Sequence, residues 1–187
     1  MPIGQTGNTF SPSIKVGSSY VNIESDIKIT KNESGVATIK VVADLTKDAK
    51  LAKLNNIIPA EMKDKDGKFN AELKYKITSE GIQDYFFNKD GKPQTIAKFD
   101  AKVGDKYEAT KTNGTIITRT VTERTDKDDF SYGYMYIKTI AVEQNSKMAG
   151  VSKVRFRVNH KFGLVFIEFV MEDASTVSMS LTPATNN

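Results

Sequence analysis

Apolar and polar residues alternate along most of this chain. From 20 to 30, and again from 71 to 78, nearly every second position is apolar and the positions between are polar or charged. A period of two is typical of β-strands that bury one face and expose the other. Further strands are predicted at 36–45, 82–87, 96–109, 115–125, 130–142, 151–160, 164–171 and 175–181. The pattern therefore predicts a chain built mainly of β-strands.

Short turn signals separate the predicted strands. Asn32 to Gly35, Asp64 to Lys68 and Asn88 to Gly91 each combine a polar residue with a glycine. Asn113-Gly114 is the strongest hairpin signal, because both central residues of a type I′ turn need a positive φ. Turns every ~8–12 residues between short strands favour a sandwich or a barrel.

One segment has helical rather than strand spacing. Leu51, Leu54 and Ile58 are three and four positions apart, which predicts a helix over 46–56. Thr46 is the expected cap for the free N–H groups of the first turn, and Pro59 is expected to stop the helix.

A repeated motif divides the chain into two related halves. Lys15-Val16-Gly17 is followed by Tyr20, and Lys102-Val103-Gly104 is followed at the same offset by Tyr107. The two glycines are expected at a bend or bulge that starts each half. We predict a flexible lead-in at 1–13 and a single β domain at 14–182, with halves at about 14–92 and 96–182. The expected fold is a strongly twisted antiparallel sheet that forms an open barrel or β-clam around one short helix.

Composition narrows the class of protein. The 187 residues suffice for one domain with a core, and there is no cysteine for a disulfide or thiolate metal site. The net charge of +4 is spread along the chain, and Lys153, Arg155 and Arg157 alternate with apolar residues. This alternation predicts a solvated strand face rather than a nucleic-acid contact. The longest apolar run, 162–171, is too short for a transmembrane helix.

Candidate chemistry is sparse. His160 is the only histidine, and it is expected to be a partly buried structural residue at the end of a strand. Asp64 and Asp66 precede Gly67 but lack the remaining ligands of a calcium loop, so a turn is expected. Three acids at 126, 128 and 129, with Glu123, are expected to be solvated.

Three tyrosines on one predicted strand complete the candidate features. Tyr132, Tyr134 and Tyr136 share a face and are expected in the core rather than in a stacking site. We therefore predict no catalytic, cofactor-binding or metal-binding residues, no cofactor and no enzymatic activity.

The motifs also carry a family resemblance. Phe10, Lys15-Val16-Gly17, Tyr20, and Gly163-Leu164-Val165 with Glu168 resemble the TapB-like exported proteins of Gram-negative bacteria. Those proteins are similar to a domain family with a LolA-like open barrel, or β-clam. The resemblance implies an exported protein of the periplasm or outer membrane, whose full-length form carries a lipidated cysteine ahead of residue 1. It implies no activity and no functional residue.

Two functional hypotheses follow. The first is an extracytoplasmic module that binds a lipid or other apolar ligand in a concave sheet face. That face is expected to be lined by six large residues, namely Tyr75, Ile77, Tyr134, Phe156, Val158 and Phe166. The alternative is an envelope structural or protein-interaction domain with a filled core, closed by the helix at 46–56.

Overall fold

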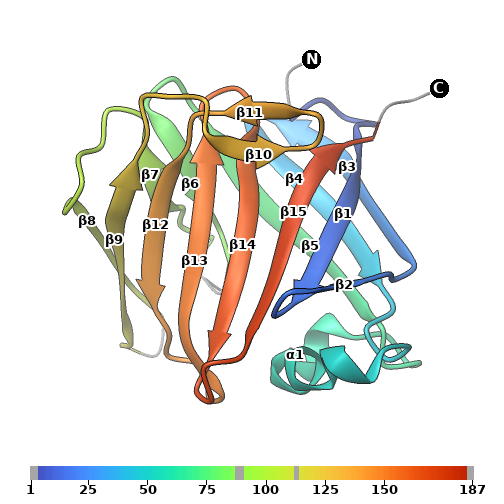
Figure 1. Cartoon of the computed structure of the whole chain (residues 1–187). Helices are drawn as coiled ribbons and strands as arrows, with labels where there is room; N and C mark the ends of the chain where they lie inside the picture. The colour runs from blue at the N-terminus through green and yellow to red at the C-terminus, as the bar shows by residue number, and fades with distance from the viewer. Residues whose placement is uncertain (1–3, 87–90, 112–113, 185–187) are drawn as a thin grey trace.

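The computed structural model describes residues 4–86, 91–111 and 114–184. Across these residues the chain forms one large antiparallel sheet that curls into a nearly closed barrel, with a two-stranded hairpin and one short α-helix (Figure 1). The prediction of a mainly β, strongly curved antiparallel sheet with one short helix is therefore confirmed.

The first half of the chain contains seven strands and the helical segment. The elements are β1 (Thr9–Val16), β2 (Ser19–Val21), β3 (Ser25–Glu33), β4 (Val36–Ala43), the 3₁₀ turns η1 (Ala49–Leu51) and η2 (Ala60–Met62) on either side of α1 (Ala52–Ile57), β5 (Phe69–Ile77), β6 (Gly81–Asp84) and β7 (Gln94–Lys98).

The second half contains the remaining eight strands. They are β8 (Lys106–Thr110), β9 (Ile116–Arg124), β10 (Phe130–Tyr132), β11 (Met135–Ile137), β12 (Ile140–Asn145), β13 (Val151–Asn159), β14 (Gly163–Met171) and β15 (Thr176–Pro183).

Strand order brings the two chain ends together and leaves one seam. The main sheet runs β7-β6-β5-β4-β3-β1-β15-β14-β13-β12-β9-β8, and β2 pairs with β1. The joint between the two halves is a full ladder from Phe10 opposite Pro183 to Val16 opposite Val177. Within the described residues no backbone ladder joins β7 to β8, so the barrel stays open at that seam.

The first strand begins earlier than the alternation predicts. Residues 9–13 belong to β1, and residues 10–13 pair with β15, although they fall within the predicted flexible lead-in. The Ser, Thr and Pro residues of this stretch do not favour a strand locally. The strand forms because it pairs with β15, which is distant in sequence.

The helix is shorter and capped differently from the prediction. The α-helix α1 starts after Leu51 without a side-chain cap, and the capped element is the preceding 3₁₀ turn η1, where the carboxylate of Asp48 accepts a hydrogen bond from the backbone N–H of Lys50 at 2.8 Å. The predicted cap, Thr46, instead bonds the side chain of Asp44 at 2.6 Å. The chain leaves the helix at Ile57, before Pro59, as expected.

The predicted strand at 130–142 is divided into three. Gly133, with φ of 60°, turns the chain back so that β10 pairs with β11 as a separate hairpin, and β12 begins only at Ile140. Figure 1 shows this hairpin across the upper ends of β13, β14 and β15, while α1 lies below the lower end of the sheet. The hairpin and the helix thus lie at opposite ends of the sheet.

Several predicted turns are present in the described residues. Ser34 and Gly35 both have positive φ between β3 and β4, as a type I′ hairpin requires. The β8–β9 hairpin also forms, although Asn113 lies outside the described residues, as do residues 88–90 of another predicted turn. Gly17 and Gly104 have φ of 58° and 98°, consistent with the bends predicted for the repeated motif.

The described part of the chain contains no helix of the length and apolar content needed to cross a membrane.

Candidate functional site: an apolar cavity beside an arginine-closed seam

An apolar cavity of about 220 Å³ lies inside the curled sheet. Its walls come from both halves of the chain, with Ile27, Ile39 and Val41 on one side and Phe156, Ile167 and Phe169 on the other. On β3 and β4 the lining residues sit two positions apart, because alternate side chains of a strand point to the same face. The concave face of the sheet is therefore hollow as well as apolar.

The helical segment forms one end of this cavity. Leu54 and Ile57 of α1 line it, and Ile58 and Met62 continue the lining beyond the helix. Leu51, in the preceding 3₁₀ turn, is fully buried and anchors the segment to the core. The amphipathic spacing read from the sequence thus places the apolar side of a very short helix against the open end of the barrel.

A buried arginine interrupts the apolar lining. Arg119 on β9 is 3% exposed, and it borders the cavity together with Gln144 of the adjacent strand β12. The Nε of Arg119 donates to Oε1 of Gln144 at 2.8 Å, and its guanidinium lies 5.3 Å from the ring centre of Phe156. The cavity therefore has one polar wall.

The same arginine forms a buried ion pair with β6. Its Nη2 lies 2.7 Å from Oδ2 of Asp84, which is fully buried. This distance is that of a close, charge-assisted contact, and Oδ1 of Asp84 accepts a hydrogen bond from the backbone N–H of Phe86 at 3.1 Å. Burial raises the pKa of Asp84, and the charge of Arg119 opposes that rise. Burial likewise lowers the pKa of Arg119, opposed by Asp84.

Arg119 also closes the seam between β7 and β8. Its Nη1 donates to the carbonyl oxygen of Thr95 at 3.1 Å and reaches that of Gln94 at 3.4 Å, both on β7. The backbone N–H of Lys98 donates to Oη of Tyr107 across the same gap at 3.3 Å. Side-chain bonds thus replace a backbone ladder at this one joint of the sheet.

A second hollow of about 310 Å³ opens at the seam. It is lined by Pro93, Gln94 and Thr95 on the β7 side, and by Tyr107, Glu108, Ala109, Ile117 and Arg119 on the β8–β9 side. Arg119 borders both this seam pocket and the apolar cavity. Its side chain is therefore the shared wall between a mixed, outward-opening pocket and an apolar interior.

Gln94 is the most unusual residue of the seam pocket. It is 4% exposed, and neither its side-chain oxygen nor its side-chain nitrogen has a hydrogen-bond partner. An unpaired buried polar group costs about 1–3 kcal/mol, so such groups are rare in folded proteins. The amide of Gln94 has both a donor and an acceptor to offer to a molecule that enters the seam.

The residues singled out from the sequence lie elsewhere. His160 is exposed, not partly buried, because β13 ends at Asn159. The buried Asn159 accepts hydrogen bonds from the backbone N–H groups of Lys161 and Phe162 and shapes the turn. The ring of His160 makes an edge contact with Phe99 at 6.4 Å between centroids.

The acidic candidates form turns and surface pairs. The carboxylate of Asp64 accepts hydrogen bonds from the backbone of Asp66 and Lys68, as the turn interpretation requires. Glu123 pairs with Arg157 at 2.7 Å. Among the residues that the structure describes, no group of three His, Cys, Asp or Glu side chains is arranged to hold a metal ion.

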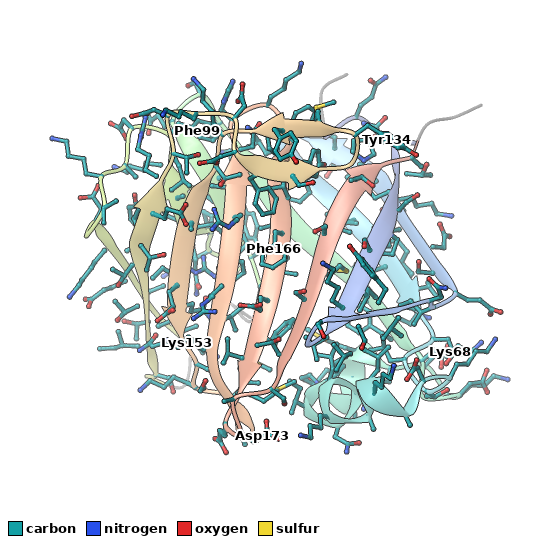
Figure 2. All side chains as sticks on the ribbon, viewed as in Figure 1. Lys68, Phe99, Tyr134, Lys153, Phe166 and Asp173 are labelled. Atoms are coloured by element: carbon teal, nitrogen blue, oxygen red, sulfur yellow. The ribbon has the colours of Figure 1, made fainter. Side chains whose placement is uncertain are left out.

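The basic strand face is confirmed as a solvated one. Lys153 and Arg155 pair with Glu143 on the neighbouring strand, and Arg155 also pairs with Glu168. The side chains of Lys153 and Arg155 are 35% and 49% exposed. Figure 2 shows Lys153 on the lower part of the outer wall.

The predicted lining of the concave face was mostly wrong. Of the six residues, Phe156 lines the apolar cavity, while Val158 and Ile77 pack in the surrounding core and Tyr75 packs with Ile29 and Ala37. Phe166 instead packs against Phe130 of the β10–β11 hairpin. Phe166 lies opposite Arg157 in the β13–β14 ladder, on the outer face of the sheet, where the hairpin covers it.

The same hairpin separates the three tyrosines. Tyr132 is buried, donates to the carbonyl oxygen of Leu181 at 2.6 Å, and has its pKa raised to about 12 by burial. Tyr134 is fully exposed and Tyr136 is 65% exposed, which contradicts the predicted core face. Tyr134 lies at the upper end of the molecule in Figure 2, on the turn of the hairpin.

The polar wall of the cavity was not predicted, although the sequence carries a signal for it. Arg119 has the same parity as the buried Ile117 and Val121, and Asp84 has the same parity as the buried Ile82. A charged residue at the inward phase of an alternating strand must be buried with a partner. Two such residues of opposite charge on two strands predict an internal ion pair.

Comparison of the chain with protein-family models, with curated proteins and with solved structures finds no significant match, so the TapB-like resemblance stays a prediction.

Proposed function

We propose that this protein is a non-enzymatic binding module that holds a small apolar ligand or lipid inside its curled sheet. The observation that carries the proposal is the apolar cavity of about 220 Å³. Its size lies between an engineered ~150 Å³ cavity that takes up benzene and the ~300 Å³ at which drug-sized pockets begin. The ligand is therefore a small molecule or a single short hydrocarbon chain.

An empty cavity of this size is costly to the fold. Apolar side chains that face an unfilled hollow lose the van der Waals contacts that a close-packed core gives them. Water is a poor filler, because a buried water needs two to four polar partners and this lining is almost entirely apolar. A bound apolar molecule recovers the lost contacts.

The proposed location is outside the cytoplasm, in the periplasm or at the outer membrane. It depends on the sequence resemblance of the Lys-Val-Gly motifs to exported proteins, and on nothing in the fold. A globomycin-sensitive shift in the size of the full-length protein in its native host is the expected mark of a lipoprotein.

A second candidate function is an envelope domain that binds another protein. The exposed hairpin residues Tyr134, Met135 and Tyr136 favour it, since large apolar side chains gathered on one turn are typical of contact surfaces. In that case the cavity has no resident molecule, and the hairpin carries the function.

Mass spectrometry of an organic extract of the purified protein tests the first proposal. A stoichiometric apolar molecule, absent from a mock purification, is the expected result. The matched variants are Val41→Phe, which fills the cavity, and Val42→Phe, which adds the same side chain at the next position, outside the cavity lining. Val41→Phe should lose the molecule and Val42→Phe should keep it. Equal loss or no loss in both would contradict the cavity as the binding site.

A further inference from the structure

The seam pocket and the apolar cavity meet at one side chain. Arg119 lines both hollows, and Gln94, whose carbonyl oxygen Arg119 reaches, lines the seam pocket. One hollow is apolar and the other carries hydrogen-bonding groups. A molecule that occupies both must have a hydrocarbon part and a polar part.

We propose that the seam pocket is the head-group subsite of the apolar cavity, and that the ligand is an uncharged amphiphile with a short hydrocarbon chain and a hydroxyl or amide head. This inference rests on the proposed function, because it assigns the chain to the same cavity. In it, the head group bonds the side-chain amide of Gln94 while the chain passes Arg119 into the interior.

The unpartnered amide is the observation that calls for a polar ligand group. Gln94 is 4% exposed and both polar atoms of its side chain lack a partner. A hydroxyl or an amide matches this residue because each can donate to Oε1 and accept from Nε2.

The charges at the seam select against an ionised head group. The positive charge of Arg119 is already paired with Asp84 at 2.7 Å, so a carboxylate gains no free cation there. An ammonium head meets the buried guanidinium, since Arg119 lies between the pocket and the cavity. Either ion also loses its hydration on entry into the pocket, and the free-energy cost of this loss is much larger for an ion than for an uncharged head group.

Neighbouring edge strands give the ligand a way in. Residues of β7 and β8 line the two sides of the pocket, and no ladder joins these strands in the described residues. Separating them breaks a few side-chain bonds, those of Arg119 and the Lys98–Tyr107 contact, rather than a continuous set of backbone bonds. The seam is therefore the side of the barrel through which a chain can pass with the fewest broken bonds.

Isothermal titration calorimetry with octanol, octanoate, octylammonium and toluene tests the inference near neutral pH, on protein freed of any resident molecule. Octanol is expected to bind at least about tenfold more tightly than either ion of the same chain length. Toluene, which has no head group, tests the apolar cavity alone. Equal or tighter binding of octanoate or octylammonium would overturn the assignment of an uncharged head.

Gln94→Leu is the decisive variant, and Gln83→Leu is its control. Gln83 lies on β6, next to the buried Asp84 and Ile82, and lines neither hollow. Gln94→Leu should weaken octanol binding by about threefold to tenfold, the range of one neutral hydrogen bond, and leave toluene binding unchanged. Gln83→Leu should leave both affinities unchanged.

The stability of the ligand-free protein gives a second, independent readout. Removing an unpaired buried amide should raise the melting temperature of Gln94→Leu by about 2–4 °C. A fall in melting temperature would mean that the amide already has a partner, and would overturn the inference. If toluene binds but Gln94→Leu binds octanol as tightly as the wild type does, the head-group subsite is wrong, while the apolar cavity is still the binding site. If toluene and octanol both fail to bind, the proposed function fails as well.

Discussion

The two closures of this barrel-like sheet differ in the kind of bond that makes them. Where the first and last strands meet, β1 and β15 pair through backbone atoms from Phe10 to Val16. At the other joint, β7 and β8 face each other across a pocket that the side chain of Arg119 spans. A backbone ladder tolerates many changes of side chain, whereas a seam held by a few side chains depends on those side chains, and above all on the buried Arg119.

This difference explains why the buried ion pair of Arg119 and Asp84 lies at the seam. The β1–β15 joint satisfies its own donors and acceptors, so the side chains beside it, such as Ile14 and Met179, are free to be apolar. At the seam, the carbonyl groups of Gln94 and Thr95 on β7 have no partner strand to donate to them. Because buried polar groups are stable only when they are paired, these carbonyl groups need donors from side chains. Arg119 supplies those donors and brings Asp84 with it as a counter-ion.

The largest predicted effect is the loss of the seam arginine. Arg119→Leu leaves the buried carboxylate of Asp84 without its counter-ion and the carbonyl group of Thr95 on β7 without this donor. We expect a loss of about 3–5 kcal/mol in the free energy of unfolding, measured by chemical denaturation. A loss below about 1 kcal/mol would show that the seam does not depend on this residue.

Arg124→Leu is the matched control on the same strand. Arg124 also crosses from β9, and its Nη1 donates to the carbonyl oxygens of Phe99 and Ala101, but its side chain is exposed. Its removal should cost no more than about 1 kcal/mol, because water replaces an exposed donor. The double variant Arg119→Leu with Asp84→Leu should recover much of the single-variant loss, since no uncompensated charge remains.

The glycines of the repeated motif give the next largest effect. Gly17 lies beside the backbone-paired joint and Gly104 beside the seam, and both have positive φ with open space where a side chain would stand. Gly17→Val and Gly104→Val should each cost about 1–3 kcal/mol from backbone strain alone, seen as a lower melting temperature. An unchanged melting temperature in either variant would remove the conformational role of that glycine.

Most of the fold was predictable from local patterns, because alternating apolar and polar residues mark the strands and glycines mark the turns. The strand at 71–77, the hairpin at Ser34-Gly35 and the stop before Pro59 are confirmed. The division at Gly133 was missed, since the alternation of Tyr132, Tyr134 and Tyr136 continues through the turn. Only the packing of Tyr132 against Leu181, distant in sequence, distinguishes the two interpretations.

The candidate site was much less predictable than the fold. Arg119, Asp84, Gln94 and Gln144 come from four strands, and their proximity follows from strand order, which the sequence does not encode locally. The inward phase of Arg119 and Asp84 in their alternating strands predicts that both are buried. It does not identify them as partners until β6, β7 and β9 are known to lie together. A hollow interior was one of the two hypotheses drawn from the sequence, the other being a filled core, whereas the polar wall depends on which strands flank the seam.

The smallest predicted effect concerns the helix end of the barrel, where a surface pair joins the backbone-paired wall to α1. Asp173, in the β14–β15 turn, forms an ion pair with Lys53 of α1, and it lies at the lower end of the molecule in Figure 2. The hydrogen bond from Lys53, with those from Ser175, lowers the pKa of Asp173 below its usual range. A lowered pKa in the folded state means that stability is present above the ordinary pKa, ~4, and is lost as pH falls below it.

Asp173→Asn should therefore lower the melting temperature slightly near neutral pH, and this difference from the wild type should shrink as pH falls below about 4. Lys53→Met removes the partner and should show the same small loss at neutral pH, because both side chains are exposed and water screens the pair. A difference that grows in acid would contradict the role of the ionised carboxylate. The stability loss expected for Asp173→Asn or Lys53→Met is much smaller than that expected for Arg119→Leu. The difference arises because Arg119 is buried and closes the sheet, whereas Asp173 and Lys53 form an exposed pair that only holds α1 against the β14–β15 turn.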